Sequence, residues 1–391
     1  MPGLPTIDEA LALVLDRVRP LDAEDVPVAD AAGRCLAEDA LAAVDLPPFD
    51  SSAMDGYAVR AADTPGSLRV AGESAAGRPA ARPLEPGEAF AISTGAVVPD
   101  GADAIVPVER TDGGRETVSV ERVEPGAHVR PRGGDAAVGQ PVALAGDLLR
   151  PVQVGALTSC GLTHVRCARR PTVAVLATGS ELRRAGEPLG PGQIYESNSV
   201  LLAAELRLLG IEARVLEPAR DDPAATRAAV ERGLACDVLI TSGGVSVGEH
   251  DHVRGALAEL GAEEVFWRVA VKPGKPVAFS VRGAALVFGL PGNPVSSLVG
   301  FELFVRPALR ALQGMRAPAP ELLPGVLGAT VRRSPDRDEL VRARLTEGVL
   351  TPIAGQESHM IARAAAANAL VLVRRGEGEI AQGSQVSWLA L

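Results

Sequence analysis

The stretch VAVLAT (Val173–Thr178) decides the fold of this chain. An uninterrupted apolar run of this length is typical of a strand buried on both faces of a parallel sheet. A helical pattern follows at Ser197–Leu209 and a second β-prone run at Ala213–Glu217. Alternation of strands and helices predicts a doubly wound, mostly parallel α/β sheet over residues 171–316.

The alternation continues toward the C-terminus. We expect helices and strands in turn, with two final strands ahead of a long helix. The helices are Pro223–Gly233, Val253–Leu260 and Val295–Leu312, and the strands are Asp237–Thr241, Val265–Val271, Val277–Val281 and Ala285–Leu290.

Three further domains are predicted around this α/β domain. Residues 1–48 together with 147–170 are expected to form a helical, elongated N-terminal domain, because a capping-box pattern and helical apolar spacing open the chain. Residues 49–146 contain short β-prone runs between glycines and prolines, which predicts a β-rich inserted domain. Residues 317–391 repeat that pattern as a small C-terminal β domain.

Composition excludes several classes of protein. The net charge of −10 disfavours nucleic-acid binding, which needs a positive surface. No run approaches the roughly 18 apolar residues of a membrane helix, and the N-terminus lacks a signal-peptide pattern. Four cysteines show no C-x-x-C spacing. We therefore expect a cytoplasmic protein that binds neither nucleic acid nor membrane.

Lysine usage is unusual. Of the 39 basic residues, only Lys272 and Lys275 are lysines, and both lie in the tetrapeptide KPGK. A lysine is a compact, movable charge that suits phosphate and oxyanion oxygens. This pair marks a candidate anion site.

Polar residues follow the predicted strands one after another. Because ligands of open α/β sheets bind beyond the carboxyl ends of the strands, these residues are expected to converge. Taken singly, an acidic residue here is more often a helix cap, and a glycine pair is more often a tight turn. The segments are Gly179–Glu181, Asp221–Asp222, Ser242–Asp251, Lys272–Lys275 and Pro291–Asn293.

The convergence predicts a phosphate-and-metal site. Glycine N–H groups, helix N-termini and the two lysines favour an anion. The carboxylates of Glu181, Asp221 and Asp251 would repel that anion unless cations lie between them, and Mg²⁺ is the natural choice. The GGVSVG run is neither a dinucleotide fingerprint nor a P-loop, and no histidine pair has zinc spacing.

At these residues the chain resembles the molybdopterin molybdenumtransferase family, which is similar to the C-terminal domain of gephyrin. The resemblance covers essentially the full length. It is carried by PPFDSSAMDGYAV (Pro47–Val59), STGA (Ser93–Ala96), ATGSEL (Ala177–Leu182), GQIYESN (Gly192–Asn198), SGGVSVGEHD (Ser242–Asp251), VKPGKP (Val271–Pro276) and GLPGNPVSS (Gly289–Ser297).

The resemblance implies insertion of molybdenum from molybdate into adenylylated molybdopterin, with Mg²⁺-dependent release of AMP. It implies three groups of site residues. The catalytic ones are Asp55, Thr94, Glu181, Asp221, Asp251 and Lys272, of which Glu181, Asp221 and Asp251 would bind metal. The substrate-binding ones are Ser242, Gly243, Gly244, Ser246, Lys275, Pro291, Asn293, Ser296, Arg342 and Ser358.

The resemblance also implies a homodimer, in which the insertion that carries Asp55 would complete the partner's site. Transient contacts with the upstream adenylyltransferase and with apo-molybdoenzymes are expected. Arg268 departs from the family, whose members can carry lysine there. Two alternatives remain, a molybdopterin adenylyltransferase and a gephyrin-like non-catalytic scaffold.

Overall fold

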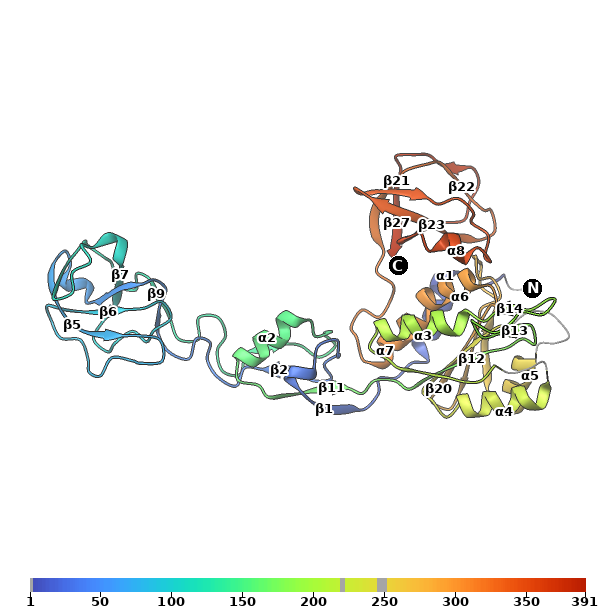
Figure 1. Cartoon of the computed structure of the whole chain (residues 1–391), viewed down its shortest axis with the longest axis horizontal. Coiled ribbons are helices and arrows are strands. Elements are labelled where there is room, and N and C mark those ends of the chain that lie inside the picture. The colour runs from blue at the N-terminus through green and yellow to red at the C-terminus, as the bar shows by residue number, and fades with distance from the viewer. Residues whose placement is uncertain (1–2, 219–221, 245–251) are drawn as a thin grey trace. The chain divides into compact units, whose positions relative to one another are not determined.

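The structure, a computed structural model, describes residues 3–218, 222–244 and 252–391. The chain divides into two compact units (Figure 1). The larger unit comprises residues 1–24, 33–37 and 168–391, and the smaller comprises residues 25–32 and 38–167. None of the helices within the described ranges has the length and apolar character needed to cross a bilayer.

A six-stranded sheet forms the centre of the larger unit. Its first four strands are parallel, the fifth is antiparallel, and the sixth is antiparallel to the fifth. This confirms the predicted mostly parallel sheet. In spatial order the strands are β15 (Ala213–Val215), β12 (Val173–Ala177), β16 (Val238–Ser242), β20 (Ala285–Leu290), β19 (Ala278–Arg282) and β17 (Glu263–Trp267).

Helices cover both faces of this sheet, as expected for a doubly wound fold. Alternate side chains of β12 point to opposite faces. Leu176 packs with α4 (Pro223–Gly233) and α5 (His252–Glu259) in one buried cluster. Val175 packs in the other cluster, on the face covered by α3, α6 and α7. Those helices are α3 (Asn198–Leu208), α6 (Pro294–Gly300) and α7 (Arg306–Leu312).

Two predicted elements are divided in the structure. The expected strand Val265–Val271 is β17 followed by a separate strand, β18 (Val271–Lys272). Arg268 lies between them with φ +75°, a left-handed conformation that ends an extended strand. The expected helix Val295–Leu312 is a continuous run of α6, a π-helical turn at Phe301–Val305, and α7.

The first helix belongs to the larger unit. Helix α1 (Ile7–Asp16) begins with the predicted capping box between Thr6 and Glu9. Its residues Ile7, Ala10 and Val14 lie in the same buried cluster as the sheet. The sequence analysis grouped this helix with residues 147–170 instead, because an apolar helical stripe does not reveal which surface it covers.

The C-terminal residues form a small closed barrel, which confirms the expected β domain. Strand β23 (Asp338–Thr346) closes the barrel, because it pairs with β24 (Val349–Pro352) on one side and with β25 (Ala369–Val373) on the other. It also accepts β18 as a parallel neighbour. The other strands are β21 (Leu323–Leu327) and β27 (Gln385–Ala390).

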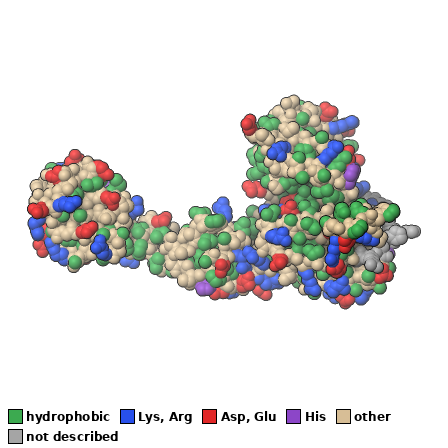
Figure 2. Space-filling view, in the orientation of Figure 1, with side chains coloured by type: hydrophobic (Ala, Val, Ile, Leu, Met, Phe, Trp, Pro, Cys, Tyr) green, Lys and Arg blue, Asp and Glu red, His purple; other side chains and the backbone are tan. Residues whose placement is uncertain are grey.

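The smaller unit is built on a five-stranded sheet. In spatial order its strands are β7 (Ala104–Pro107), β4 (Gly56–Val59), β6 (Glu88–Ile92), β5 (Gly66–Ser74) and β8 (Thr117–Val120). Outside this sheet, β10 (Pro141–Ala143) pairs with β2 (Ala40–Leu41), and helix α2 spans Pro151–Ser159. Acidic and basic side chains are interspersed over the visible surface, in keeping with the modest net charge (Figure 2).

Asp237 joins the starts of the neighbouring strands β12 and β16. Its carboxylate accepts two hydrogen bonds from the Arg169 guanidinium, both at 2.7 Å, and two from Thr172, at 2.7 and 2.8 Å. The hydrogen bonds from Arg169, followed by those from Thr172, hold the pKa of Asp237 at about 2, below its ordinary value of 3.8.

Replacing Asp237 with asparagine should lower the unfolding free energy of the larger unit at pH 7 by about 1–2 kcal/mol, after allowance for solvent screening. The folded-state pKa is depressed, so the carboxylate stabilises the protein above pH 4. That contribution is lost as the pH falls toward 2. Hydrogen exchange in β12 and β16 at pH 7 and pH 3 measures it.

The matched control is Glu217→Gln, which removes the partner of Arg184 in an exposed ion pair. It should change stability little at either pH. An equal loss in both variants at pH 7 would contradict the assigned role of Asp237.

Candidate active site

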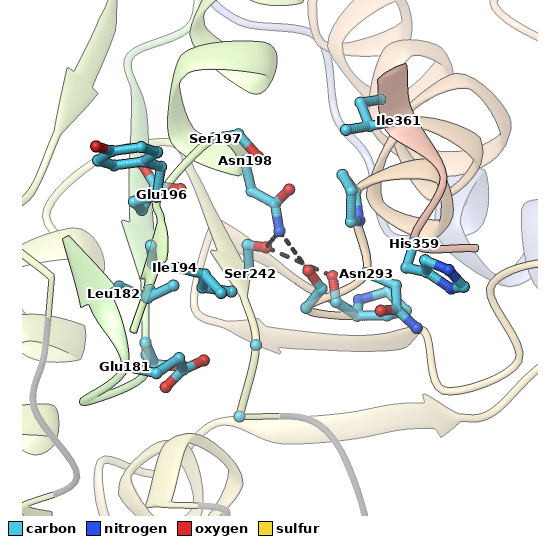
Figure 3. A pocket seen from close by; sticks show the side chains of 18 of the residues that line it. Glu181, Leu182, Ile194, Glu196, Ser197, Asn198, Ser242, Asn293, His359 and Ile361 are labelled. Atoms are coloured by element: carbon cyan, nitrogen blue, oxygen red, sulfur yellow. Dashed lines mark hydrogen bonds between the residues drawn. The ribbon is translucent and has the colours of Figure 1, made fainter. Parts of the chain in front are cut away.

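A cavity of about 580 Å³ lies at the carboxyl edge of the central strands (Figure 3). One wall comes from the strand ends and their loops. The opposite wall comes from the C-terminal barrel, from His359 and from Ile361, the first residue of helix α8 (Ile361–Ala364). Its volume is in the range of small-molecule sites. Its principal polar lining residues are Glu181, Glu196, Asn198, Ser242, Asn293 and His359.

The carboxyl ends of β12, β16 and β20 are aligned. Ala177 is opposite Ser242, which is in turn opposite Leu290. The chain then turns sharply at Gly243, where φ is +88° and a Cβ atom would lie 2.8 Å from the carbonyl oxygen of Thr178. Only glycine suits this position, so the loops after neighbouring strands can pack closely at the cavity floor.

A buried hydrogen-bond network lies beneath the cavity. The amide nitrogen of Asn198 donates to Ser242 Oγ at 2.8 Å and to the Gly292 carbonyl at 2.7 Å. Ser297 Oγ donates to the Pro291 carbonyl at 2.6 Å. The network fixes the Pro291–Asn293 loop against the end of β16.

Glu181 presents an exposed carboxylate to the cavity. It follows β12 and precedes a short parallel pair, β13 (Leu182–Arg183) with β14 (Ile194–Tyr195). The Ile194 N–H donates to the Glu181 carbonyl at 3.0 Å, which anchors the backbone. Figure 3 shows the Glu181 side chain on the side of the cavity opposite His359.

The two lysines occupy different environments. Lys272 Nζ lies 3.1 Å from the Glu339 carboxylate, and its side chain is 51% exposed. Lys275 is exposed, and the next residue, Pro276, lines the cavity. Both lysines therefore lie near the expected edge, with the charge of Lys272 already paired.

The barrel loop meets the start of helix α6 directly. Asn293 Nδ2 donates to Ser358 Oγ at 2.8 Å, and the Val295 N–H donates to the Ser358 carbonyl at 3.1 Å. Ser296, one residue further on, is buried. The structure thus brings together Pro291, Asn293 and Ser358, as the sequence analysis expected.

Arg342 lies in β23 of the C-terminal barrel, beneath the loop that faces the cavity. Its side chain is completely buried, and the guanidinium donates to the carbonyls of Gly355, Glu357 and Met360 at 2.9–3.2 Å. Burial lowers the pKa of Arg342. In this structure Arg342 therefore holds the loop that carries Ser358 and His359, and its expected role in substrate binding stays a prediction.

Asp55 and Thr94 lie together in the smaller unit. The Asp55 carboxylate accepts hydrogen bonds from the Thr94 backbone N–H at 2.6 Å and from the Thr94 hydroxyl at 3.0 Å. These bonds, the backbone one first, lower the pKa of Asp55. The MDGYA and STGA motifs thus meet at the Asp55 carboxylate.

Three expected site residues, Asp221, Ser246 and Asp251, lie outside the described residues. The metal set of Glu181 with Asp221 and Asp251 therefore stays a prediction. Within the described ranges, no group of three or more His, Cys, Asp or Glu side chains is placed to hold a metal ion.

Three of the principal polar cavity residues were not predicted from the sequence: Glu196, Asn198 and His359. Asn198 had a signal, since it is one of only three asparagines and ends the GQIYESN motif. His359 had none beyond its position next to Ser358. Arg268 is not part of the cavity lining; its guanidinium stacks 3.9 Å from the centroid of Trp267.

Replacing Thr94 with valine should raise the pKa of Asp55 part of the way toward its ordinary value of 3.8. The change removes the hydroxyl donor and keeps the backbone N–H, which is the larger cause of the depression. Carboxyl-carbon NMR titration measures the pKa. Thr94→Ser keeps both donors and should leave the pKa depressed, and equal pKa values in all three proteins would contradict the assignment.

Replacing Arg342 with methionine should open the 355–360 loop, because three of its carbonyls lose a charged donor. Amide exchange within the loop reports a loss of about 2–4 kcal/mol in local stability. Arg344→Met is the control, since the exposed Arg344 gives a single hydrogen bond to Ala366. Unchanged exchange in the Arg342 variant would refute this role.

Family models and curated relatives agree with this architecture. Residues 5–161 match the MoeA N-terminal region (domain I and II), residues 174–311 match a probable molybdopterin binding domain, and residues 324–391 match the MoeA C-terminal region (domain IV). Molybdopterin molybdenumtransferase 2 of Mycobacterium tuberculosis is 39% identical over 97% of this chain and 98% of its own length. The Haemophilus influenzae molybdopterin molybdenumtransferase is 35% identical over 98% of this chain and 97% of its own.

Solved structures agree as well. A molybdopterin biosynthesis MoeA protein from Pyrococcus horikoshii aligns over the full length of both chains with a TM-score of 0.87 and 29% identity. The described cavity falls within the segment that matches the molybdopterin binding domain, with one wall from the C-terminal region. The chain therefore belongs to the molybdopterin molybdenumtransferase family, transferases of molybdenum cofactor biosynthesis.

Proposed function

We propose that this protein inserts molybdenum from molybdate into adenylylated molybdopterin and releases AMP in a Mg²⁺-dependent reaction. The observation that carries the proposal is the cavity at the strand ends, where a carboxylate, hydroxyls and amides face one space. A phosphate-bearing substrate needs donors from loop backbones and side chains together with a cation site. The cavity and its rim supply such donors, and Glu181 offers one carboxylate toward the expected cation.

The substrate-binding groups have distinct tasks in this proposal. Ser242, Asn293 and Ser358 offer short polar side chains close to the ring and phosphates. Gly243 and Gly244 let the backbone approach the substrate. Lys272 and Lys275, with Ser296, would attract molybdate, because a tetrahedral oxyanion is held by cations and hydroxyl donors.

Glu181, with Asp221 and Asp251, would hold Mg²⁺. Oxygen ligands from carboxylates fit this ion, and the exposed Glu181 carboxylate has no ion pair with any residue in the described ranges. When bound, the ion would neutralise charge on the phosphoanhydride that is cleaved. Glu181 also limits where the anhydride can lie, since its charge repels phosphate oxygens wherever no cation lies between them.

Asp55 and Thr94 are proposed as catalytic residues supplied by the smaller unit. The depressed pKa of Asp55 keeps this carboxylate ionised near neutrality. In the proposed homodimer, the insertion that carries them would complete the site of the partner. We also propose a cytoplasmic location and transient contact with the upstream adenylyltransferase and with apo-molybdoenzymes.

The alternatives have less support. The full-length relatives at 35–39% identity are named molybdenumtransferases, which disfavours an adenylyltransferase. A gephyrin-like scaffold would have no use for an exposed carboxylate on the cavity wall or for the KPGK lysines.

The test is direct. The purified protein is mixed with adenylylated molybdopterin, molybdate and Mg²⁺, and AMP release and reactivation of an apo-molybdoenzyme are measured. Glu181→Gln keeps the shape of the side chain and removes its charge, so it should slow both reactions by about 10²-fold or more. Leaving out ATP should have no effect.

Arg184→Gln is the matched control, because this exposed residue pairs with Glu217 outside the cavity. It should retain full activity. Folded protein that releases no AMP and restores no activity would overturn the proposal, and ATP-dependent turnover would favour the adenylyltransferase.

A further inference from the structure

Only one of the two polar atoms in the Asn198 side chain forms hydrogen bonds with the described part of the protein. It is the first residue of α3, and it is 9% exposed at the cavity. Its amide nitrogen makes two hydrogen bonds, to Ser242 Oγ and to the Gly292 carbonyl. Its oxygen, Oδ1, is buried and has no partner among the residues that the structure describes.

The orientation of this amide is fixed. Rotating the side-chain amide by 180° would place Oδ1 against the Gly292 carbonyl oxygen, where two acceptors would face each other at the observed 2.7 Å. Only the amide nitrogen can occupy that position. The neighbouring helix turn is held as well, because the Ser199 N–H donates to the Glu196 carboxylate at 2.8 Å.

A buried acceptor without a donor is costly, and such atoms are uncommon in folded proteins. Figure 3 shows the Asn198 side chain between the Ile194 wall and Asn293, with a dashed line from its nitrogen to Ser242. The lining around it includes the apolar residues Ile194, Pro291 and Ile361. An unpartnered acceptor beside these apolar residues suits a flat ring that carries an N–H group.

We propose that Asn198 is a specificity-determining residue, whose Oδ1 accepts a hydrogen bond from the 2-amino edge of the pterin ring of the substrate. The inference rests on the proposed function, which supplies the pterin. A pterin carries an amino donor at position 2, whereas the corresponding lumazine carries a carbonyl oxygen there. The lumazine would turn an acceptor toward Oδ1, and a site built to accept a donor rejects a ligand that lacks it.

The experiment uses two probes, the phosphate monoesters of 6-hydroxymethylpterin and of 6-hydroxymethyllumazine. Their dissociation constants for the full-length protein are measured by ligand fluorescence. Wild-type protein should bind the pterin at least about tenfold more tightly than the lumazine. Asn198→Ala should bring the two constants to within about twofold of each other.

The control separates ligand contact from structural support. Ser297→Ala removes the hydroxyl that donates to the Pro291 carbonyl in the same network, and it leaves Asn198 Oδ1 in place. It should preserve the pterin preference even where both affinities fall. A purely structural role for Asn198 predicts parallel losses for both probes in both variants.

Equal binding of the two probes by wild-type protein, or no binding of either, would overturn the inference. Release of AMP from adenylylated molybdopterin is measured on the same samples. If that release is intact while the preference is absent, Asn198 is not the determinant and the proposed function stands. If wild-type protein prefers the pterin over the lumazine but releases no AMP, the role of Asn198 in ring recognition is supported and the proposed reaction is refuted.

Discussion

The aligned ends of three parallel strands are the constraint on which the site depends. Ala177, Ser242 and Leu290 lie in one row across the sheet, so the loops that follow them leave the same edge. Because all three strands are buried on both faces, a shift of one residue would turn core side chains toward the wrong layer. The fold therefore fixes the position of the site loops before any ligand is present.

Charge is used in two ways in the larger unit. Arg342 is enclosed and donates to the carbonyls of one loop at the cavity, while Asp237 joins the starts of β12 and β16 at the opposite edge of the sheet. These charges are held by several hydrogen bonds each, which is what makes their burial tolerable. Glu181 and Lys275 remain exposed at the cavity or near it. Rigid charges shape the loops, and exposed charges face the ligand.

The sequence predicted the strands and helices of the α/β domain more accurately than it predicted the contacts of individual side chains. The apolar run at Val173–Thr178 and the alternation after it were enough for the sheet, because burial on both faces leaves a strong pattern. Motif identity did not reveal that Arg342 is buried, since an arginine that binds an anion and one that binds carbonyls look alike. The half-satisfied amide of Asn198 depends on distances across 94 residues of chain and required coordinates.

The pairing of β18 with β23 has a mechanical consequence. Val271 and Lys272 form a strand of the C-terminal barrel, although the sequence around them belongs to the α/β domain. Glu339, on the same barrel strand, is the carboxylate that lies 3.1 Å from the Lys272 ammonium. Any swing of the barrel would therefore carry this lysine with it, while Glu181 stayed with the sheet. The Lys272 cation and the Glu181 carboxylate are therefore attached to different parts of the fold, the barrel and the sheet.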